Sequence, residues 1–375
     1  MDQRDQQKVP MKKIVVIGTR GIPNILGGVE THCEELFPRI AASDYDVTII
    51  RRKSYAKDTL KEYKGVKLAD ISTPKKKSFE AIIHTLKGVW VAKYHCHTDI
   101  LHIQGIGPAL VTPFAKLLRL KVVLTIHSLN YDHEKWGKIA KFLLKTGEKM
   151  GCRFADEVIV ISDVIKNNIL KSYNRKNVHL IYNGVPEPNF IQTTHYLDKL
   201  GVKPQKYIFA MGRFVPEKNF HQLINAFLSL KNRDEYKLVL AGDADFHDEY
   251  SRKLKKMANE NGVILTGFIR GEKLYELLTH ASAFVLPSSH EGLPISLLEA
   301  MSYDLPVIVS DIPANLAIGL DQDSYFPVGN EEKLMEKLNN LIDKKPIKCK
   351  YQLDSYQWEK IAKQTIQVYE KNYNV

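Results

Sequence analysis

The sequence is poor in cysteine and has no long hydrophobic run. Its 375 residues include four scattered cysteines, Cys33, Cys96, Cys152 and Cys349, and none of them forms a C-x-x-C pair. Isolated cysteines are typical of a reducing compartment and argue against a disulfide framework. No stretch approaches the roughly 20 apolar residues of a membrane-spanning helix, and residues 1–10 lack the apolar segment of a secretion signal. We therefore expect a disordered leader at residues 1–10 and a cytoplasmic protein.

Several nucleotide-binding and catalytic motifs are also absent. The sequence contains neither a G-x-S-x-G nucleophile elbow nor a G-x-x-x-x-G-K-[ST] phosphate loop. The first glycine loop reads Gly18-x-x-Gly21 rather than G-x-G-x-x-G, and the next strand ends in Arg51-Arg52 instead of an acidic residue. A dinucleotide enzyme is therefore disfavoured, although an arginine could hold a 2′-phosphate and keeps an NADP enzyme open.

The sequence contains no complete metal-binding motif. His95-Cys-His97 and His102 have ligand side chains, but no second pair completes a tetrahedral site. Asp243-Ala-Asp245 has the spacing that holds a metal-bound nucleotide diphosphate, yet short polar loops are common at the ends of parallel strands. We expect no metal and no cofactor.

Positive charge, in contrast, is abundant. The formal net charge is +11 and the pI is about 9.2, which favours an anionic partner: nucleic acid, a nucleotide or a membrane surface. No RNA-binding aromatic motif accompanies the charge, so we expect no nucleic acid. Lysines cluster at 75–77 beside a predicted helix over 79–93 that contains Trp90. This combination predicts contact with an anionic membrane, although a helix packed on a sheet with a solvated lysine face explains most of the pattern.

Short apolar strands alternate with helical segments along most of the chain, which predicts parallel sheets covered on both faces. The rhythm breaks at residues 182–188, where Asn-Gly followed by two prolines is typical of a linker. We predict an α/β fold of two doubly wound, Rossmann-like domains, residues 11–188 and 189–355, facing a central cleft. A last helix within residues 356–375 is expected to cross back onto the first domain.

Two carboxylates bracket a strand-to-helix turn in the second domain. Glu291 lies in the loop, and Glu299 lies in a predicted helix over 294–303 that is apolar almost all round. A carboxylate among apolar residues is costly unless a polar group meets it. The loop could hold an anionic, hydroxyl-rich ligand at the helix N-terminus, or Glu299 could be a solvated residue on a surface helix.

Other candidates lie where predicted strands end. Gly27 and Gly28 precede a helix whose free N–H groups favour a phosphate, unless they form an ordinary turn. Arg213 and Lys218 share one loop, and together they suit a diphosphate, unless they are ordinary surface cations. His127 ends a strand, where it could hydrogen-bond a hydroxyl, act as a base near pH 7, or be merely structural.

These parts together resemble a known family. Gly27-Gly28-Val-Glu30, Gly212-Arg213 with Lys218, and Glu291 and Glu299 in a Pro-Ser-x-x-Glu-Gly context resemble the family-4 retaining glycosyltransferases of the GT-B fold. Asn183-Gly-Val and Trp358 are similar to that family too. Leu101–Pro108, Thr125-Ile-His127 and Glu134–Gly137 resemble the first domain of bacterial rhamnosyltransferase-type enzymes.

The resemblance implies roles for these residues. Arg213 and Lys218 would bind the donor diphosphate, Glu299 the ribose and Glu291 the transferred sugar. The remaining residues of the implied site are His127, which would touch the sugar, Gly27 and Gly28, which would let the backbone approach the phosphates, and Gly292 and Leu293 in the donor loop.

The implied activity is a metal-independent, retaining transfer of a sugar such as rhamnose from a nucleotide-diphosphate sugar to a glycan or lipid-linked acceptor. The implied place of action is the inner face of the membrane. The first domain would be the acceptor side and the second would bind the nucleotide sugar. The segment after His127 departs from relatives, which puts a role for Asp132 in doubt. A nucleotide-sugar epimerase and a non-catalytic basic module that binds nucleic acid or membrane remain the alternatives.

Overall fold

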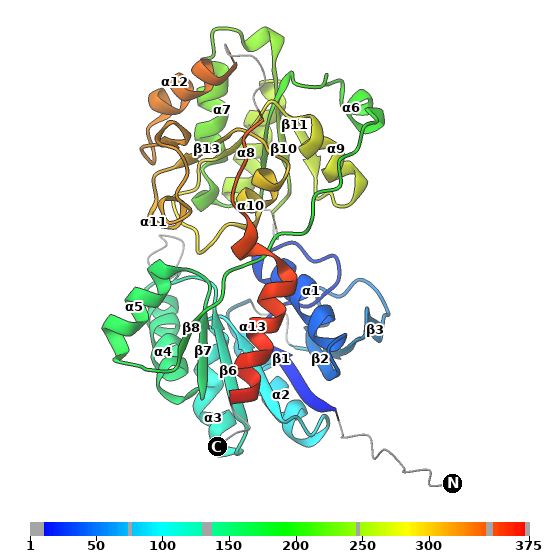
Figure 1. Ribbon diagram of the computed structural model, residues 1–375, viewed down its shortest axis with the longest axis vertical. Coiled ribbons are helices and arrows are strands. Elements are labelled where there is room, and N and C mark those ends of the chain that lie inside the picture. Colours follow the sequence, from blue (N-terminus) through cyan, green and yellow to red (C-terminus); the bar gives the residue numbers. More distant parts are fainter. Residues whose placement is uncertain (1–10, 74–76, 130–136, 245–247, 343–347, 372–375) are drawn as a thin grey trace.

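The computed structural model describes residues 11–73, 77–129, 137–244, 248–342 and 348–371, so the predicted leader at residues 1–10 lies outside it. The chain forms two α/β domains, one above the other in Figure 1. Each domain is built on a largely parallel sheet with helices on both faces, which confirms the predicted fold class.

The sheet of the N-terminal domain has eight strands among the residues described, in the order β3-β4-β2-β1-β5-β6-β7-β8. All pairs are parallel except the short hairpin β3–β4. The strands are β1 (Lys12–Ile17), β2 (Tyr45–Arg52), β3 (Glu62–Tyr63), β4 (Val66–Ile71), β5 (Ile100–Gln104), β6 (Lys121–Ile126), β7 (Glu157–Val160) and β8 (Val178–Leu180).

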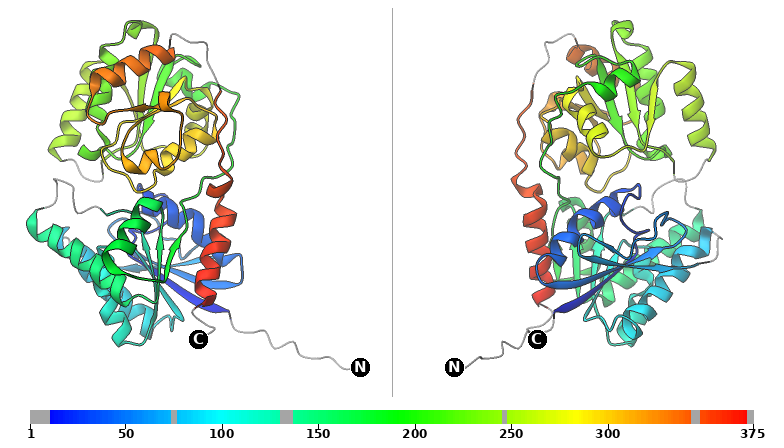
Figure 2. Two further views of the ribbon diagram at one scale, coloured as in Figure 1. Left: turned by 60° about the vertical axis from the view of Figure 1, so that its left-hand side comes forward. Right: turned by 90° about the vertical axis from the view of Figure 1, so that its right-hand side faces the viewer.

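Two helical layers cover this sheet. One layer contains α2 (Lys77–Tyr94), the 3-10 turn η1 (Pro108–Val111), α3 (Thr112–Leu117), α4 (Lys138–Phe154) and α5 (Asp163–Tyr173), and the other contains α1 (Gly28–Ala41) and α13 (Trp358–Lys371). Figure 2 shows α13 on the opposite side of the sheet from α4. Residues of β1 alternate between the layers: Val15 and Ile17 join the core under α2–α5, whereas Ile14 and Val16 join the core under α1 and α13.

The sheet of the C-terminal domain has six strands in the described part of the chain, in the order β11-β10-β9-β12-β13-β14. The strands are β9 (Tyr207–Met211), β10 (Lys237–Ala241), β11 (Ile264–Gly267), β12 (Ala283–Leu286), β13 (Val307–Ser310) and β14 (Tyr325–Phe326). Helices α7 (Phe220–Leu228), α8 (Glu249–Glu260) and α12 (Glu331–Ile342) pack on one face; α6 (His195–Leu200), α9 (Glu272–His280) and α10 (Ile295–Ser302) pack on the other. The short helix α11 (Pro313–Leu316) joins β13 to β14.

The chain crosses between the domains twice, and the two crossings lie side by side. Val185 in the first crossing pairs with Gln357 just before α13, and the Val185 N–H donates to the Tyr356 carbonyl at 2.7 Å. The Trp358 ring is fully buried against Gly184, where a Cβ atom would overlap it. Helix α13 then packs along α1 on the N-terminal domain.

Several expected elements have different bounds. The helix predicted over 79–93 is α2, which is described from Lys77 to Tyr94, and the helix predicted over 294–303 is α10, which runs from Ile295 to Ser302. Helix α5 and strand β8 were not predicted, because α5 is rich in polar residues and β8 is only three residues long. None of the described helices has both the length and the apolar character needed to cross a bilayer.

Candidate active site

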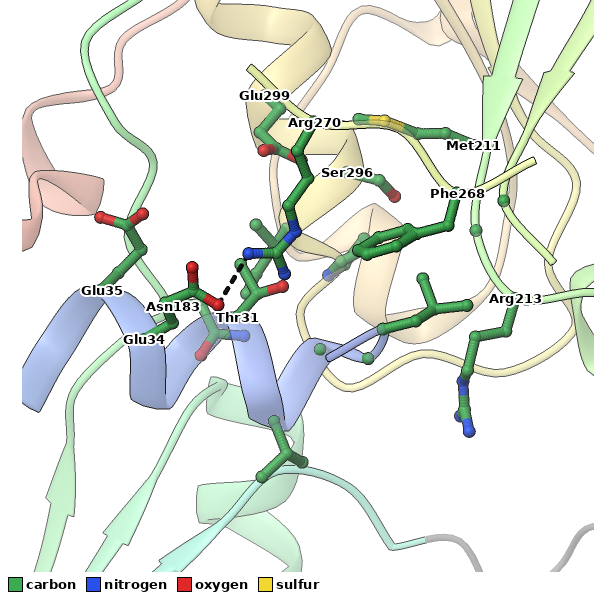
Figure 3. Close-up of a pocket in the computed structure, with 18 of the residues that line it drawn as sticks. Thr31, Glu34, Glu35, Asn183, Met211, Arg213, Phe268, Arg270, Ser296 and Glu299 are labelled. Atoms are coloured by element: carbon green, nitrogen blue, oxygen red, sulfur yellow. Dashed lines mark hydrogen bonds and ion pairs between the residues drawn. The ribbon is translucent and has the colours of Figure 1, made fainter. Parts of the chain in front are cut away.

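A cleft of about 530 Å³ opens between the two domains. Its walls include Gly27, Gly28 and His127 from the N-terminal domain. The C-terminal domain contributes Arg213, Lys218, Glu291, Gly292, Leu293 and Glu299. Figure 3 shows side chains from both domains converging there. The structure therefore brings every candidate site residue of the sequence analysis to one cavity.

The sheet topology explains this convergence. In each sheet the strand order reverses beside its first strand, between β1 and β5 in the N-terminal domain and between β9 and β12 in the C-terminal domain. Loops leaving the carboxyl ends of strands at such a reversal diverge and leave a crevice. Arg213 follows β9 and Glu291 follows β12, so both lie at the reversal of the second sheet. Gly27 and Gly28 follow β1 at the reversal of the first sheet.

The C-terminal wall carries a close ion pair. Lys218 Nζ and Glu291 Oε1 are 2.5 Å apart, and their side chains are only 15% and 12% exposed. Lys218 ends the 3-10 turn η3 (Pro216–Lys218), so this pair ties the β9–α7 loop to the loop after β12. The pair places a cation and a carboxylate side by side, where an anionic ligand can meet one and a hydroxyl-bearing ligand the other.

The N-terminal wall begins with the first turn of α1. Gly27 is the residue before the helix, with φ near +150°, and a Cβ there would overlap the ion pair that Arg20 forms with Glu30. Glu30 is buried, and the desolvation that would raise its pKa is outweighed by Arg20, so its pKa lies below the usual value. A Cβ on Gly28 would meet no atom within 4 Å. The backbone at Gly28 is therefore open to a ligand in the cleft.

Glu299 projects from α10 into the cleft and has an unusual environment. Its pKa is raised to about 7: burial raises it most, Arg270 lowers it, and the nearby Glu35 carboxylate adds to the rise. Among the described residues, none donates a hydrogen bond to this carboxylate. The polar partner predicted for Glu299 is therefore not supplied by the part of the chain that the structure describes. The side chain faces the cavity, where a ligand would supply one.

His127 follows β6 and is almost fully buried at the cleft wall. Its Nε2 donates to Gln104 Oε1 at 2.7 Å, and its ring meets His32 edge-on, with ring centroids 4.7 Å apart. Burial lowers the pKa of His127 well below its ordinary value, and His32 and His102 lower it further. The imidazole is therefore neutral near pH 7, which favours the predicted hydrogen-bonding role over a base that titrates near pH 7.

A chain of polar contacts fixes the donor loop, residues 291–293, against the N-terminal domain. His32 Nδ1 donates to Asn183 Oδ1 at 3.0 Å, and Asn183 Nδ2 donates to the Leu293 carbonyl at 2.9 Å. Gly292 lies so close to the His127 carbonyl that a Cβ would overlap it. These contacts place the loop that carries Glu291 directly beside His127.

Residues missed by the sequence analysis complete the cleft. Arg270, in the loop after β11, forms a 2.7 Å ion pair with Glu34 of α1 across the domain boundary, marked by the dashed line in Figure 3. Its guanidinium also lies over the Phe268 ring, with the carbon 5.1 Å from the centroid. Position at the carboxyl end of a strand was the only available signal for Arg270. Nothing local in the sequence pointed to His32.

Other residues considered earlier lie outside this site. Arg51 is fully buried in ion pairs with Asp58 at 2.9 Å and Asp70 at 2.7 Å, so the suggestion that it holds a 2′-phosphate is wrong. His102 is buried between Tyr369 and Thr125. Asp243 pairs with Lys255 at 2.6 Å.

Within the described residues, no group of three or more His, Cys, Asp or Glu side chains could hold a metal ion. Asp132, Asp245, Lys75 and Lys76 lie outside those residues.

Two family models match consecutive parts of the chain. Residues 26–187 match the model described as "Glycosyltransferase Family 4", and residues 194–369 match "Glycosyl transferases group 1". An uncharacterized glycosyltransferase of Methanocaldococcus jannaschii is 25% identical, with 95% of this chain and 97% of the relative covered. An amylovoran biosynthesis glycosyltransferase of Erwinia amylovora is 25% identical, covering 88% of this chain and 90% of the relative.

Solved structures share the same fold. Sucrose-phosphate synthase from Thermosynechococcus elongatus superposes with a TM-score of 0.81 at 19% identity, covering 96% of this chain and 99% of that protein. The Anabaena protein HepE, in complex with UDP and glucose, superposes with a TM-score of 0.78 at 19% identity, covering 97% and 100%. This likeness establishes the two-domain GT-B fold of glycosyltransferases, as the sequence resemblance predicted.

We predict that Asn183→Asp weakens the junction between the domains. The substitution keeps the acceptor for His32 but turns an oxygen toward the Leu293 carbonyl, so a buried hydrogen bond becomes a repulsion. The free energy of unfolding, measured by urea denaturation, should fall by about 1–3 kcal/mol. Asn261→Asp is the matched control, because Asn261 also donates from Nδ2 to a backbone carbonyl, that of Met257, but lies within one domain and near solvent. Equal losses in the two variants would contradict a special role for Asn183.

We also predict that Glu299 makes the ligand-free protein less stable as pH rises. Its pKa, raised to about 7, keeps it protonated in the folded state where the unfolded chain, with a pKa of 4.5, has already ionised. The unfolded state therefore binds fewer protons between about pH 4.5 and 7, and stability falls across that window. Glu299→Gln should be more stable than the wild type by on the order of 2 kcal/mol at pH 8, with no difference near pH 4.

Thermal unfolding at several pH values measures this difference. Glu62→Gln, at an exposed position of β3, makes the same change of atoms and should leave the pH profile unaltered. Superimposable profiles for wild type and Glu299→Gln would rule out the raised pKa.

Proposed function

Because the chain is a glycosyltransferase of the GT-B fold, we propose that it is a retaining enzyme. It transfers a sugar from a nucleotide-diphosphate sugar in the C-terminal domain to a glycan or lipid-linked saccharide that enters over the N-terminal domain. One observation supports this proposal: a single cleft is lined by the open backbone at Gly28 and by the side chains of Arg213, Lys218, Glu291 and Glu299.

The two cations support binding of the donor diphosphate. Arg213 and Lys218 lie on the loop after β9, and the N-terminus of α1 faces the same cavity from the other domain. A guanidinium, an ammonium and free helix N–H groups all favour phosphate oxygens. Glu299 suits the ribose, because two vicinal hydroxyls can donate to an otherwise unpartnered carboxylate. Binding would favour the ionised form of Glu299 and release a proton near neutral pH.

The reaction needs charge stabilisation more than an acid–base pair. The bond between the anomeric carbon and the β-phosphate oxygen breaks, and an acceptor hydroxyl oxygen bonds to that carbon on the same face. The hydroxyl proton passes to the departing phosphate, so the products are a glycoside and a nucleoside diphosphate. Arg213 and Lys218 stabilise the charge that develops on the leaving group.

Glu291 and His127 suit the transferred sugar. Glu291 Oε1 is held 2.5 Å from Lys218 Nζ, which fixes the carboxylate beside the place where the phosphate would lie. The neutral His127 donates to Gln104 from Nε2, which leaves Nδ1 to accept from a sugar hydroxyl. Close approach of Gly292 to the His127 carbonyl sets the distance between the two groups.

Relatives support a role in polysaccharide synthesis. One is named for amylovoran biosynthesis, and another, from Salmonella typhimurium, is named an O-antigen chain mannosyltransferase. Structural neighbours contain UDP or UDP-glucose. We propose a hexose or deoxyhexose, rhamnose among them, as the sugar, a lipid-linked saccharide as the acceptor, and the inner face of the membrane as the place of action.

The proposal is tested by adding nucleoside diphosphates and nucleotide sugars one at a time and measuring thermal stability. A ligand at 100 times its dissociation constant adds about 2.7 kcal/mol to the free energy of unfolding. The stabilising nucleotide sugar is then incubated with and without saccharide acceptors, and the products are analysed. Retained anomeric configuration in the product is expected. Conversion of the donor without any acceptor would instead identify an epimerase, and absence of nucleotide binding would leave only a non-catalytic module.

Replacing Arg213 by Ala should lower kcat/KM about 10²- to 10³-fold, because one preorganised charge at the leaving group is lost. Steady-state kinetics with the identified donor measures the effect. The matched control is Arg233→Ala, an exposed arginine of the 3-10 turn η4 (Arg233–Glu235) in the same domain, which should retain wild-type kinetics. Equal kcat/KM values for wild type and Arg213→Ala would remove Arg213 from the donor site.

Removing divalent metal ions should leave turnover unchanged. The positive charge at the diphosphate comes from Arg213 and Lys218 in this proposal, so no bound cation is required. Rates are measured after dialysis against EDTA and again after Mg²⁺ or Mn²⁺ is restored. A loss of activity that either ion reverses would show that the two side chains are insufficient.

A further inference from the structure

The outer surface of helices α2–α5 concentrates the exposed apolar residues of the molecule. Fifteen large hydrophobic side chains are exposed in the described part of the chain, and nine of them belong to these four helices. They are Leu86, Trp90 and Tyr94 of α2, Leu117 of α3, Ile139, Phe142 and Phe154 of α4, and Val164 and Leu170 of α5. Single exposed apolar residues are ordinary, but their collection on one layer of one domain is not.

The apolar side chains are most prominent at the start of α4. Ile139 is 78% exposed and Phe142 is 68% exposed. Lys138, Lys145 and Lys149 are exposed as well, and their spacing of three and four residues around Phe142 places all four side chains along one face of the helix. The only carboxylate of α4 is Glu148, which is buried and accepts from Tyr173 at 2.8 Å.

Positive charge covers the whole layer. Residues 80–94, 112–117, 138–154 and 163–173 contain ten lysines and arginines and three carboxylates. Two of these carboxylates, Glu80 and Glu148, are buried, so the outer surface carries an even larger cationic excess. On α2, Trp90 and Tyr94 lie against each other with ring centroids 4.2 Å apart, and both are about half exposed.

From these observations we infer that the layer α2–α5 docks the protein on an anionic lipid bilayer. Lysines around projecting Ile, Phe, Trp and Tyr side chains match such a surface, because the headgroups attract the cations and the interfacial region accepts the apolar groups. The opposite face of the sheet, which α1 and α13 cover, contributes none of these exposed large hydrophobic side chains. The occupant is the lipid surface rather than a second protein, because like charges would oppose pairing of two copies through this layer.

The location suits the proposed reaction. Helix α4 starts eleven residues after His127, and Ser128 still lines the cleft, so the exposed start of α4 is close in sequence to the acceptor-side wall. A bilayer along this layer would bring a lipid-linked acceptor to the cleft without withdrawing its lipid. This role rests on the proposed function, whereas binding to vesicles does not require it.

The test is sedimentation of the full-length protein with vesicles of phosphatidylcholine alone or mixed with phosphatidylglycerol. Wild type should bind only the mixed vesicles, and salt should weaken that binding. Lys145→Gln with Lys149→Gln should weaken binding by roughly 30-fold, since each lysine near an anionic surface contributes about fivefold. Lys253→Gln with Lys256→Gln on α8 removes the same charge from the other domain and should bind as wild type.

The apolar contribution has its own pair of variants. Ile139→Ser with Phe142→Ser should weaken binding by about tenfold or more, whereas Leu316→Ser with Val328→Ser, at exposed sites of the C-terminal domain, should not. All four double variants should keep wild-type melting temperatures and wild-type rates on a water-soluble acceptor.

Three results would overturn the inference: no binding of wild type to mixed vesicles, equal losses in the α4 and α8 variants, or a dimer in solution that Ile139→Ser with Phe142→Ser dissociates. Its failure is distinct from failure of the proposed function. Sugar transfer to a soluble acceptor without vesicle binding would refute only the docking surface. Vesicle binding that depends on α4, without sugar transfer, would refute only the enzymatic proposal.

Discussion

The site depends on one junction between the domains. Asn183 accepts from His32 of α1 and donates to the Leu293 carbonyl, and Gly292 lies against the His127 carbonyl without room for a Cβ. Arg213, Lys218 and the loop at residues 291–293 belong to one domain, and the histidines belong to the other. A shift of one domain relative to the other would separate them, so the chemistry requires this contact to have a fixed geometry. Hydrogen bonds of definite direction supply that geometry better than apolar packing.

Electrostatics divides the cleft into two regions. Lys218 and Glu291 neutralise each other at the C-terminal wall, whereas Glu299 has only the opposing influences of Arg270 and Glu35 and a pKa near 7. The first pair is already satisfied and is therefore preorganised. Glu299 is held at an energetic cost that a ligand with hydroxyl donors would relieve. Strain of this kind in a cleft is typical of a binding site rather than of a stabilising contact.

Much of this arrangement follows from the sequence, and the reasons for the exceptions are physical. Alternating apolar strands and helices predicted both domains, and residues at strand ends predicted part of the cleft lining, because parallel strands deliver their loops to one edge. Arg270 could not be recognised, since its partner Glu34 is distant in sequence. His32 lies within a helix, and its partner Asn183 is 151 residues away in the sequence, so no local pattern links the two. The suggestion that Arg51 holds a 2′-phosphate was wrong because no local sequence signal shows that it is buried with Asp58 and Asp70.

The two faces of the N-terminal sheet differ in their outer surfaces, because only one of them helps to hold the two domains together at the cleft. Helix α13 returns from the C-terminal domain and covers α1, and Trp358 at its start anchors the crossing beside Asn183 and Gly184. That face is committed to holding the domains together. The helices α2–α5 are free of this constraint and keep exposed apolar and basic residues that stability alone does not require. Exposed apolar residues gathered on one layer are explained by a partner outside the chain, and their position on the N-terminal domain places that surface on a domain that also forms a wall of the cleft.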